Sequence, residues 1–146
     1  MRIEKVKIND LSQIISLEKT TFKDDSFSKE TMEQLIYNHT FFLKIVNNDE
    51  KIIGFIIVLE QERNTLNIIN FLIKDDYRNT GLGSYLLNHV FMEIKKSKIF
   101  KRIILNVQTS NLRALKLYKN YNFRIIKEVD NYYRKGDNAY LMELKL

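Results

Sequence analysis

The sequence predicts a single-domain α/β fold, with a mixed central sheet of about seven strands and helices on both faces. Three observations support this class. Short runs rich in β-branched residues alternate with longer segments whose apolar residues recur at helical spacing. Two buried strands flank one long helix, an order that implies a right-handed parallel crossover. The chain has 146 residues, enough for one hydrophobic core, so we expect one domain spanning 1–146.

The first forty residues are expected to form one strand and two helices. Residues Ile3 to Ile8 alternate enough between apolar and polar to form a strand. Asp10 and Gln13 have the spacing of a capping box at the start of the first helix. Ser28 can cap the second helix, whose apolar residues fall on one side.

The middle of the chain is expected to supply the centre of the sheet. Residues 41–46 and 52–59 are apolar runs rich in β-branched residues, and the polar residues 47–51 between them indicate a hairpin. Residues 66–73 form a nearly continuous apolar run. Such a run predicts a central strand that is buried on both faces.

The rest of the chain predicts one long helix, one short helix and three strands. The helix over 81–97 has a broad apolar stripe, and 103–107 reads as a short buried strand. Asn111 can cap the short helix that follows. Two further strands are expected near 123–129 and 139–144.

Composition restricts the class of protein. The net charge of +6 would attract nucleic acid or a smaller polyanion such as a phosphorylated cofactor. No aromatic residues are regularly interleaved with the densest basic run, 95–102, so nucleic-acid binding is not expected as the main function. No apolar run approaches the roughly 20 residues of a membrane span. We expect a cytoplasmic protein without a membrane partner.

The sequence contains no pattern typical of a metal site or a nucleophilic triad. The chain has no cysteine, and His39 and His89 have no partner motif around them. No Ser, His and Asp are arranged as a triad. We therefore expect no metal cofactor.

A glycine turn follows the predicted central strand closely. The chain has only four glycines, and two of them are Gly81 and Gly83. A tight turn that opens a helix leaves several backbone N–H groups without partners at one point, where the helix dipole favours negative charge. The pattern predicts a phosphate-binding turn. The alternative is a turn that uses glycine only for its backbone freedom.

The spacing of this turn excludes two common nucleotide motifs. A P-loop needs Lys followed by Ser or Thr after its second glycine, and a dinucleotide-binding turn needs a third glycine. Neither feature is present. The pattern Arg78-x-x-Gly81-x-Gly83 instead resembles the acetyl-CoA pyrophosphate signature of the GNAT superfamily of N-acetyltransferases.

Two later segments extend this resemblance over nearly the whole chain. Residues 105–111, followed by Ala114, Tyr118 and Phe123, are similar to the GNAT segment in which a strand leads into Ser-Asn, Ala-x-x-x-Tyr and Gly-Phe. Residues 131–142 are similar to the Tyr-Tyr-containing tail of protein Nα-acetyltransferases. That subgroup includes the ribosomal-protein-alanine acetyltransferases.

The resemblance implies acetyl-CoA as co-substrate and identifies residues that would bind it. The glycine turn and its helix would hold the pyrophosphate. The central strand would be splayed from its neighbour, so that its backbone groups bind the pantetheine and polarise the carbonyl. The residues so implicated are Phe71, Leu72, Ile73, Arg78, Asn79, Thr80, Gly81, Leu82, Gly83, Ser84 and Asn111.

The resemblance also implies roles for three tyrosines. Tyr118 would be the general acid that protonates the departing thiolate; the alternative is a core aromatic residue. Tyr132 and Tyr133 would grip the first residues of a substrate peptide. The alternative for this pair is aromatic packing at a strand edge, although adjacent strand residues point to opposite faces.

Two positions depart from the family pattern. Asn122 replaces the usual Gly before Phe123, a mild change because Asn tolerates the left-handed conformation that ends a helix. Asn106 stands where relatives commonly carry Glu or His as the proton acceptor, and an amide has no usable basicity. Asn106 would then orient a water molecule that carries the proton away. Glu60, Glu62 and the pair Asp24-Asp25 are the other candidate acceptors, or ordinary surface charges.

The resemblance implies direct transfer of acetyl from acetyl-CoA to an amine in a ternary complex. The favoured acceptor is the N-terminal α-amino group of a protein or peptide, with a ribosomal protein as one candidate. One alternative is a small amine such as a polyamine or an antibiotic. A further alternative is a CoA-binding regulatory domain without catalysis.

Overall fold

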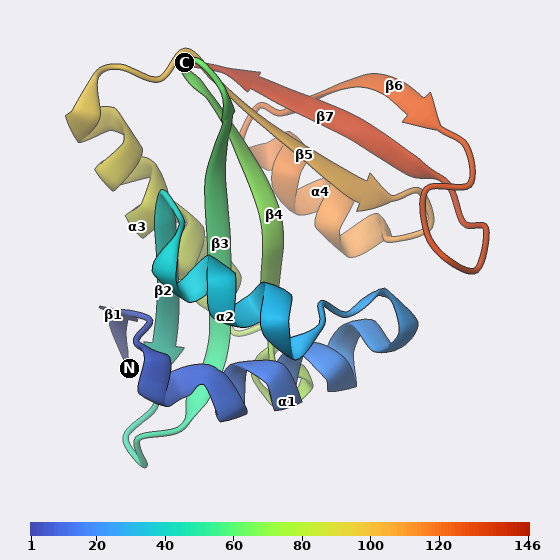
Figure 1. Cartoon of the computed structure of the whole chain (residues 1–146). Coiled ribbons are helices and arrows are strands. Elements are labelled where there is room, and N and C mark those ends of the chain that lie inside the picture. The colour runs from blue at the N-terminus through green and yellow to red at the C-terminus, as the bar shows by residue number, and fades with distance from the viewer.

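The computed structural model describes the whole chain, Met1–Leu146, as one mixed sheet flanked by helices (Figure 1). The strands are β1 (Arg2–Lys5), β2 (Phe41–Val46), β3 (Ile52–Glu62), β4 (Thr65–Ile73), β5 (Arg102–Gln108), β6 (Arg124–Val129) and β7 (Ala139–Lys145). The helices are α1 (Leu11–Phe22), α2 (Lys29–Tyr37), α3 (Leu82–Ser97) and α4 (Leu112–Asn120), with 3-10 turns η1 (Ile8–Asp10), η2 (Lys23–Asp25) and η3 (Asp75–Tyr77). The strand order is β1-β2-β3-β4-β5-β7-β6, and only β4 and β5 pair in parallel. The predicted α/β fold class is confirmed.

Helices cover both faces of the sheet, as predicted. Helices α1 and α2 pack over a cluster of 10 buried apolar residues that includes Ile14 and Phe55. Helices α3 and α4 pack over a cluster of 18 that includes Leu86 and Leu115. Figure 1 shows α1 and α2 in front of the sheet and α3 and α4 behind it. The sheet therefore separates two hydrophobic clusters, one on each of its faces.

The strand buried on both faces is β3, and not β4 as predicted. All residues from Ile52 to Val58 of β3 are buried, whereas β4 alternates between buried and half-buried residues. The reason is that β4 pairs with β5 only along its first half, over Thr65–Ile68 and Arg102–Leu105. Beyond Ile68 the two strands part and leave a gap. The resemblance had implied this splay.

A β-bulge lies where β4 leaves β5. Ile57 of β3 faces Asn70, and Val58 faces Ile68, so Ile69 is an extra residue on β4. A bulge bends its strand and re-aims the side chains that follow. Ile68 packs in the cluster under α3 and α4, whereas Leu72 packs in the cluster under α1 and α2. The bulge therefore changes which face the second half of β4 presents to each helix pair.

Two details of the N-terminal segment differ from the prediction. Strand β1 ends before Ile8, where the 3-10 turn η1 begins. Asp10 makes no side-chain cap; its carboxylate accepts the Lys7 N–H at 2.8 Å and the Lys44 ammonium at 2.8 Å. Gln13 accepts the backbone N–H of Ile52 at 3.2 Å. The predicted capping box is therefore wrong, because both side chains bind partners that lie outside the first turn of α1.

Gly54 of β3 marks a close approach to β4. A Cβ at this position would lie 2.6 Å from Ile73 Cδ1 and 2.8 Å from the carbonyl oxygen of Leu72. Because the second atom belongs to the backbone, the strand itself would have to move. We expect Gly54→Ala to lower the free energy of unfolding by about 1–3 kcal/mol, measured by urea titration.

Gly83→Ala in α3 is the matched control for this prediction. Its Cβ would meet Phe71 Cζ at 3.7 Å and Ile73 Cγ1 at 3.9 Å, which are ordinary contacts. Its stability should stay equal or rise, because Ala forms helices better than Gly. If the two variants were equally stable, the close approach of β3 and β4 would be contradicted.

Candidate active site

Two cavities open beside the gap between β4 and β5 and share one wall. The first cavity, about 460 Å³ in volume, lies between the end of β4, the N-terminus of α3 and the start of α4. The second cavity, about 820 Å³, lies between β4, β5, the end of α1 and the β6–β7 connection. The shared wall consists of Thr21, Phe22, Phe71, Asn111, Ala114 and Tyr118. Groups bound in the two cavities could therefore meet at this wall.

The two cavities differ in charge. The charged residues that line the first cavity are Arg78 and Arg113, and no carboxylate lines it. The second cavity is lined by Glu18, Asp25 and Arg134. Two arginines suit a polyanion such as a chain of phosphates, whereas two carboxylates beside one arginine suit a cation such as an ammonium group.

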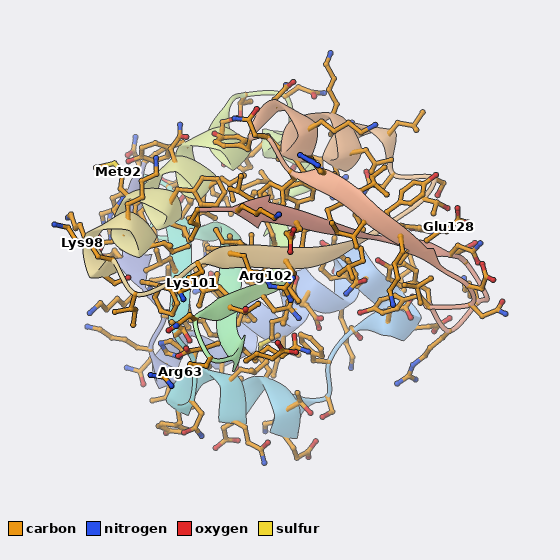
Figure 2. The ribbon with its side chains drawn as sticks, turned by 90° about the horizontal axis from the view of Figure 1, so that it is seen from above. Arg63, Met92, Lys98, Lys101, Arg102 and Glu128 are labelled. Atoms are coloured by element: carbon orange, nitrogen blue, oxygen red, sulfur yellow. The ribbon has the colours of Figure 1, made fainter.

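The dense basic run at the end of α3 contributes to neither cavity. Figure 2 shows Lys98 and Lys101 at this end of the molecule, opposite Glu128 of β6. Arg102 of the same run is ion-paired with Glu143. The run begins in the last turn of α3 and continues past its C-terminus, where cations complement the helix dipole.

Two residues of the glycine turn have a left-handed backbone conformation, which Gly and Asn adopt more readily than other residues. Asn79 and Gly81 have φ values of 61° and 82°, in the left-handed region. Gly81 is the N-cap residue of α3, and its carbonyl accepts the N–H of Tyr85 at 3.0 Å. The N–H groups of Leu82 and Gly83 then lie in the first helical turn, where they have no intrahelical acceptor. Of the predicted turn residues, Arg78, Asn79 and Gly83 line the first cavity, whereas Thr80, Gly81, Leu82 and Ser84 do not.

Arg78 connects the glycine turn to the end of β4. Its Nε donates to the carbonyl oxygen of Ile73 at 3.1 Å, and its guanidinium also pairs with Asp75 at 2.5 Å. The side chain is still 36% exposed. Arg78 therefore fixes the turn against the strand and keeps part of its guanidinium available for a bound anion.

The second half of β4 directs backbone groups into the gap. The N–H of Lys74 donates to the carbonyl of Ile53 at 2.8 Å. Because hydrogen-bonded pairs alternate along an antiparallel ladder, the backbone groups of Leu72 also face β3. Those of Phe71 and Ile73 face away from β3, toward the gap. Leu72 also lines the first cavity, but its backbone N–H and C=O point toward β3 and not into the gap.

Tyr118 of α4 lies on the wall that the two cavities share. It is 7% exposed, and its ring packs at centroid distances of 5.6 Å from Phe123 and 6.4 Å from Phe71. It belongs to the larger hydrophobic cluster, as the core interpretation predicted, and it also reaches both cavities. Burial raises the pKa of the Tyr118 hydroxyl, with a smaller contribution from Tyr133. The hydroxyl therefore keeps its proton near neutral pH and can act as an acid.

Asn111 begins α4 as predicted. Its Oδ1 accepts the backbone N–H of Ala114 at 3.2 Å, which satisfies one donor of the first turn. Asn111 also lines both cavities. The cap occupies the side-chain oxygen, so a ligand would meet the amide nitrogen of this residue.

Tyr132 and Tyr133 lie in the connection between β6 and β7 and line the second cavity. Their rings meet edge to face, with centroids 4.9 Å apart. The N–H of Tyr133 donates to the carbonyl of Asp137 at 3.1 Å, within a turn. Burial raises the pKa of Tyr133 to about 12, and Tyr132 and Asp25 add to this shift. Since neither tyrosine is in a strand, the strand-edge alternative is wrong.

The candidate proton acceptors are placed very differently. Asn106 of β5 lines the second cavity, and so does Asp25, whose Oδ1 accepts the N–H of Arg134 at 3.0 Å. Glu60 and Glu62 are exposed at the end of β3 and line neither cavity. These two glutamates are therefore surface charges. Asp24, the other member of the predicted pair, is likewise exposed and lies outside both cavities.

Two buried polar residues that line the second cavity had no predicted role, Glu18 of α1 and Asn70 of β4. Glu18 is 2% exposed and Asn70 is 7% exposed. Each had a detectable signal in the sequence. Glu18 is a charge on the apolar side of α1, four residues after Ile14, and Asn70 interrupts the apolar run 68–73.

Comparison with protein families agrees with this geometry. The model of the acetyltransferase (GNAT) family matches residues 8–123. The chain belongs to the GNAT acetyltransferase family. It is accordingly an acetyl-CoA-dependent N-acetyltransferase, and the resemblance to this family is confirmed over the glycine turn and residues 105–123.

Several known proteins resemble this GNAT chain over nearly its whole length. It is 26% identical over 154 residues to an N-alpha-acetyltransferase of Saccharolobus solfataricus, which covers 96% of this chain and 90% of that protein. Ard1 from Thermoplasma volcanium has the same fold, with a TM-score of 0.90, 23% identity, and coverage of 99% and 97%. Arabidopsis thaliana Naa50, in complex with the bisubstrate analogue CoA-Ac-MVNAL, gives a TM-score of 0.86, 26% identity, and coverage of 99% and 98%.

Two further properties of this GNAT chain concern membranes and metals. None of its helices combines the length and the apolar character needed to cross a bilayer. No three His, Asp or Glu side chains are grouped so that they could hold a metal ion.

Proposed function

We propose that this acetyltransferase acts on the N-terminal α-amino group of a protein or peptide, by direct attack in a ternary complex. The observation that carries the proposal is the meeting of two cavities of opposite charge at Tyr118 and Phe71. The first cavity suits the phosphates of acetyl-CoA, and the second suits an ammonium group. The N-alpha-acetyltransferase relative and the bisubstrate analogue bound by Naa50 support this acceptor.

In this proposal the first cavity binds acetyl-CoA. The N–H groups at the start of α3 would bind the pyrophosphate, with Arg78 and Arg113 supplying positive charge. The backbone groups of Phe71 and Ile73 would bind the pantetheine arm and polarise the reacting carbonyl. The amide of Asn111 would add a contact where the two cavities meet.

The second cavity would orient the acceptor amine. Tyr132 and Tyr133 would contact the first residues of the peptide, since both line the cavity and their rings pack against each other edge to face. Tyr118 would donate its proton to the leaving sulfur. Asn106 would hold a water molecule near the amine, because an amide can both donate and accept hydrogen bonds. A ribosomal protein as the acceptor remains a prediction.

A panel of acceptors tests the proposal. We expect thiol release from acetyl-CoA with short peptides that have a free N-terminus, and none with the same peptides after N-terminal blocking. Lysine and spermidine are the competing acceptors. Turnover on spermidine alone would indicate a small-amine acetyltransferase. Binding of acetyl-CoA without turnover on any acceptor would indicate a regulatory domain.

A further inference from the structure

Glu18 is a buried carboxylate in the wall of the second cavity, and no family motif assigns it a role. Its Oε1 and Oε2 accept the backbone N–H of Phe27, at 2.9 and 3.0 Å. Its Oε2 also accepts Asn70 Nδ2 at 3.3 Å. Both donors are neutral, so no cation compensates the buried negative charge, and such a charge opposes folding.

Asn70 adds a second unfavourable feature to this pair. Its Nδ2 donates to Glu18, whereas its Oδ1 is buried and has no hydrogen-bond partner. An amide in place of the Glu18 carboxylate would bury no charge, whereas turning Asn70 to meet it would leave the Nδ2 instead of the Oδ1 without a partner. The pair is therefore less stable than a neutral one of the same shape. Features that oppose stability in this way are concentrated at functional sites.

The remaining ionisable side chains of the second cavity are poor proton acceptors. Asp25 is exposed, and its Oδ1 already accepts the backbone N–H of Arg134. The hydroxyls of Tyr118 and Tyr133 have raised pKa values, so neither is a base near neutral pH. The other titratable or charged groups that line the cavity are Tyr132, which is half exposed, and the guanidinium of Arg134, which has no hydrogen-bond acceptor atom.

Turns η1 and η2 pack against α1 and carry Asp10, Lys23, Asp24 and Asp25, but none of these side chains pairs with Glu18, whose hydrogen-bond partners are Phe27 and Asn70. Helix α2 presents apolar residues such as Met32 and Leu35 to the shared core. Strand β3 presents apolar residues such as Phe55 and Ile57. From β4 the neighbour is the neutral Asn70. Glu18 is thus the one enclosed carboxylate of the second cavity.

We propose that Glu18 accepts the proton of the attacking amine through a water molecule in the second cavity, and that Asn70 positions its carboxylate. This inference rests on the proposed function. Asn106 lines the same cavity from β5 and can hold that water molecule. The assignment supplies the proton acceptor that Asn106 itself cannot be.

The reaction then balances with the release of one proton. The acceptor enters as an ammonium and gives one proton to Glu18, which frees the lone pair of its nitrogen. The new C–N bond forms as the C–S bond breaks, and the sulfur leaves with the electron pair and takes the proton of Tyr118. The excess proton on the product nitrogen restores the Tyr118 hydroxyl. Glu18 releases its proton to solvent.

Burial raises the pKa of the Glu18 carboxyl, and the hydrogen bonds from Phe27 and Asn70 oppose this shift. A higher pKa makes the carboxylate a better proton acceptor near neutral pH. The folded state also binds this proton more tightly than the unfolded state. The stability contributed by the protonated form is therefore complete below the unfolded-state pKa and is lost as pH rises through the folded-state pKa.

Glu18→Gln separates a proton acceptor from a structural residue. The amide keeps an acceptor for the Phe27 N–H and removes the buried charge. We expect an equal or higher melting temperature at about pH 7, with no gain at about pH 4. We expect kcat on a free peptide to fall by about 10²–10³-fold and to lose its acid limb, with acetyl-CoA affinity within about threefold.

Three further variants complete the test. Glu18→Asp keeps a carboxylate and should retain the acid limb and part of kcat. Glu62→Gln changes an exposed glutamate outside both cavities and should match the wild type. Asp25→Asn removes the competing carboxylate and should keep the acid limb.

Several results would overturn the role of Glu18. They are a kcat of Glu18→Gln within threefold of wild type, a lower kcat with an unchanged pH profile, or loss of the acid limb in Asp25→Asn. Each of these results can be interpreted only if the wild type and Glu62→Gln both turn over the peptide. Absence of turnover in both would instead refute the proposed function, and this inference with it.

Discussion

Replacing Tyr118 by Phe is expected to lower kcat by about 10²–10⁴-fold while acetyl-CoA binding stays nearly unchanged. The substitution keeps the ring, which packs against Phe71 and Phe123 in the core. It removes the one phenol hydroxyl that lines both cavities; the other hydroxyl there, that of Thr21, donates to the carbonyl of Leu17. Because burial raises the pKa of Tyr118, the wild-type hydroxyl stays protonated and should cause no alkaline limb near neutral pH.

Steady-state turnover on a free peptide and calorimetric binding of acetyl-CoA measure the two effects separately. Tyr37→Phe is the matched control, since Tyr37 is 65% exposed on α2 and lines neither cavity. The control should keep both values. A decrease of less than threefold in a folded Tyr118→Phe protein would mean that Tyr118 is only a core residue.

Replacing Gly83 by Val is expected to weaken acetyl-CoA binding by about 10–100-fold. Gly83 lines the first cavity, and its Cβ would point toward Phe71 and Ile73. A single methyl group fits there, but the branched side chain of Val would fill the space between β4 and the first turn of α3. Losing one charge-assisted hydrogen bond to a phosphate costs about 1.5–3 kcal/mol, and 1.4 kcal/mol is a factor of ten.

Titration calorimetry tests this prediction, with circular dichroism to establish that the variant is folded. Met92→Val is the matched control, because Met92 is exposed farther along α3 and lies outside both cavities. Its affinity for acetyl-CoA should equal that of the wild type. Unchanged affinity in a folded Gly83→Val protein would show that the glycine turn does not bind the phosphates.

The order of the elements could be predicted from the sequence because periodicity is a local property. The hairpin over residues 41–59 and the helix after Gly81 were both predicted from patterns within a few turns of the chain. The caps formed by Ser28 and Asn111 were predicted for the same reason, since each binds a backbone N–H three residues later. Residues 78–84 are contiguous, so the turn could be identified by its own spacing.

Local reasoning failed where a side chain finds its partner far along the chain. Asp10 was expected to cap α1, but Lys44, 34 residues later, pairs with its carboxylate. Gln13 was expected to complete the same cap, but it accepts the N–H of Ile52. The cap and the long-range partner compete for the same oxygen atoms. Only the packing of α1 against the sheet decides between them.

The sequence alone therefore determined the fold class, the position of the glycine turn and the inward side of α4 on which Tyr118 lies, because each depends on patterns of residues that are close in the chain. The tertiary structure decided that β4 leaves β5 after Ile68, and that two cavities of opposite charge meet there. It also brought Glu18 to Asn70, 52 residues apart in the chain, through one hydrogen bond. Burial and pairing of this kind depend on which elements pack together, and no short stretch of sequence contains that information.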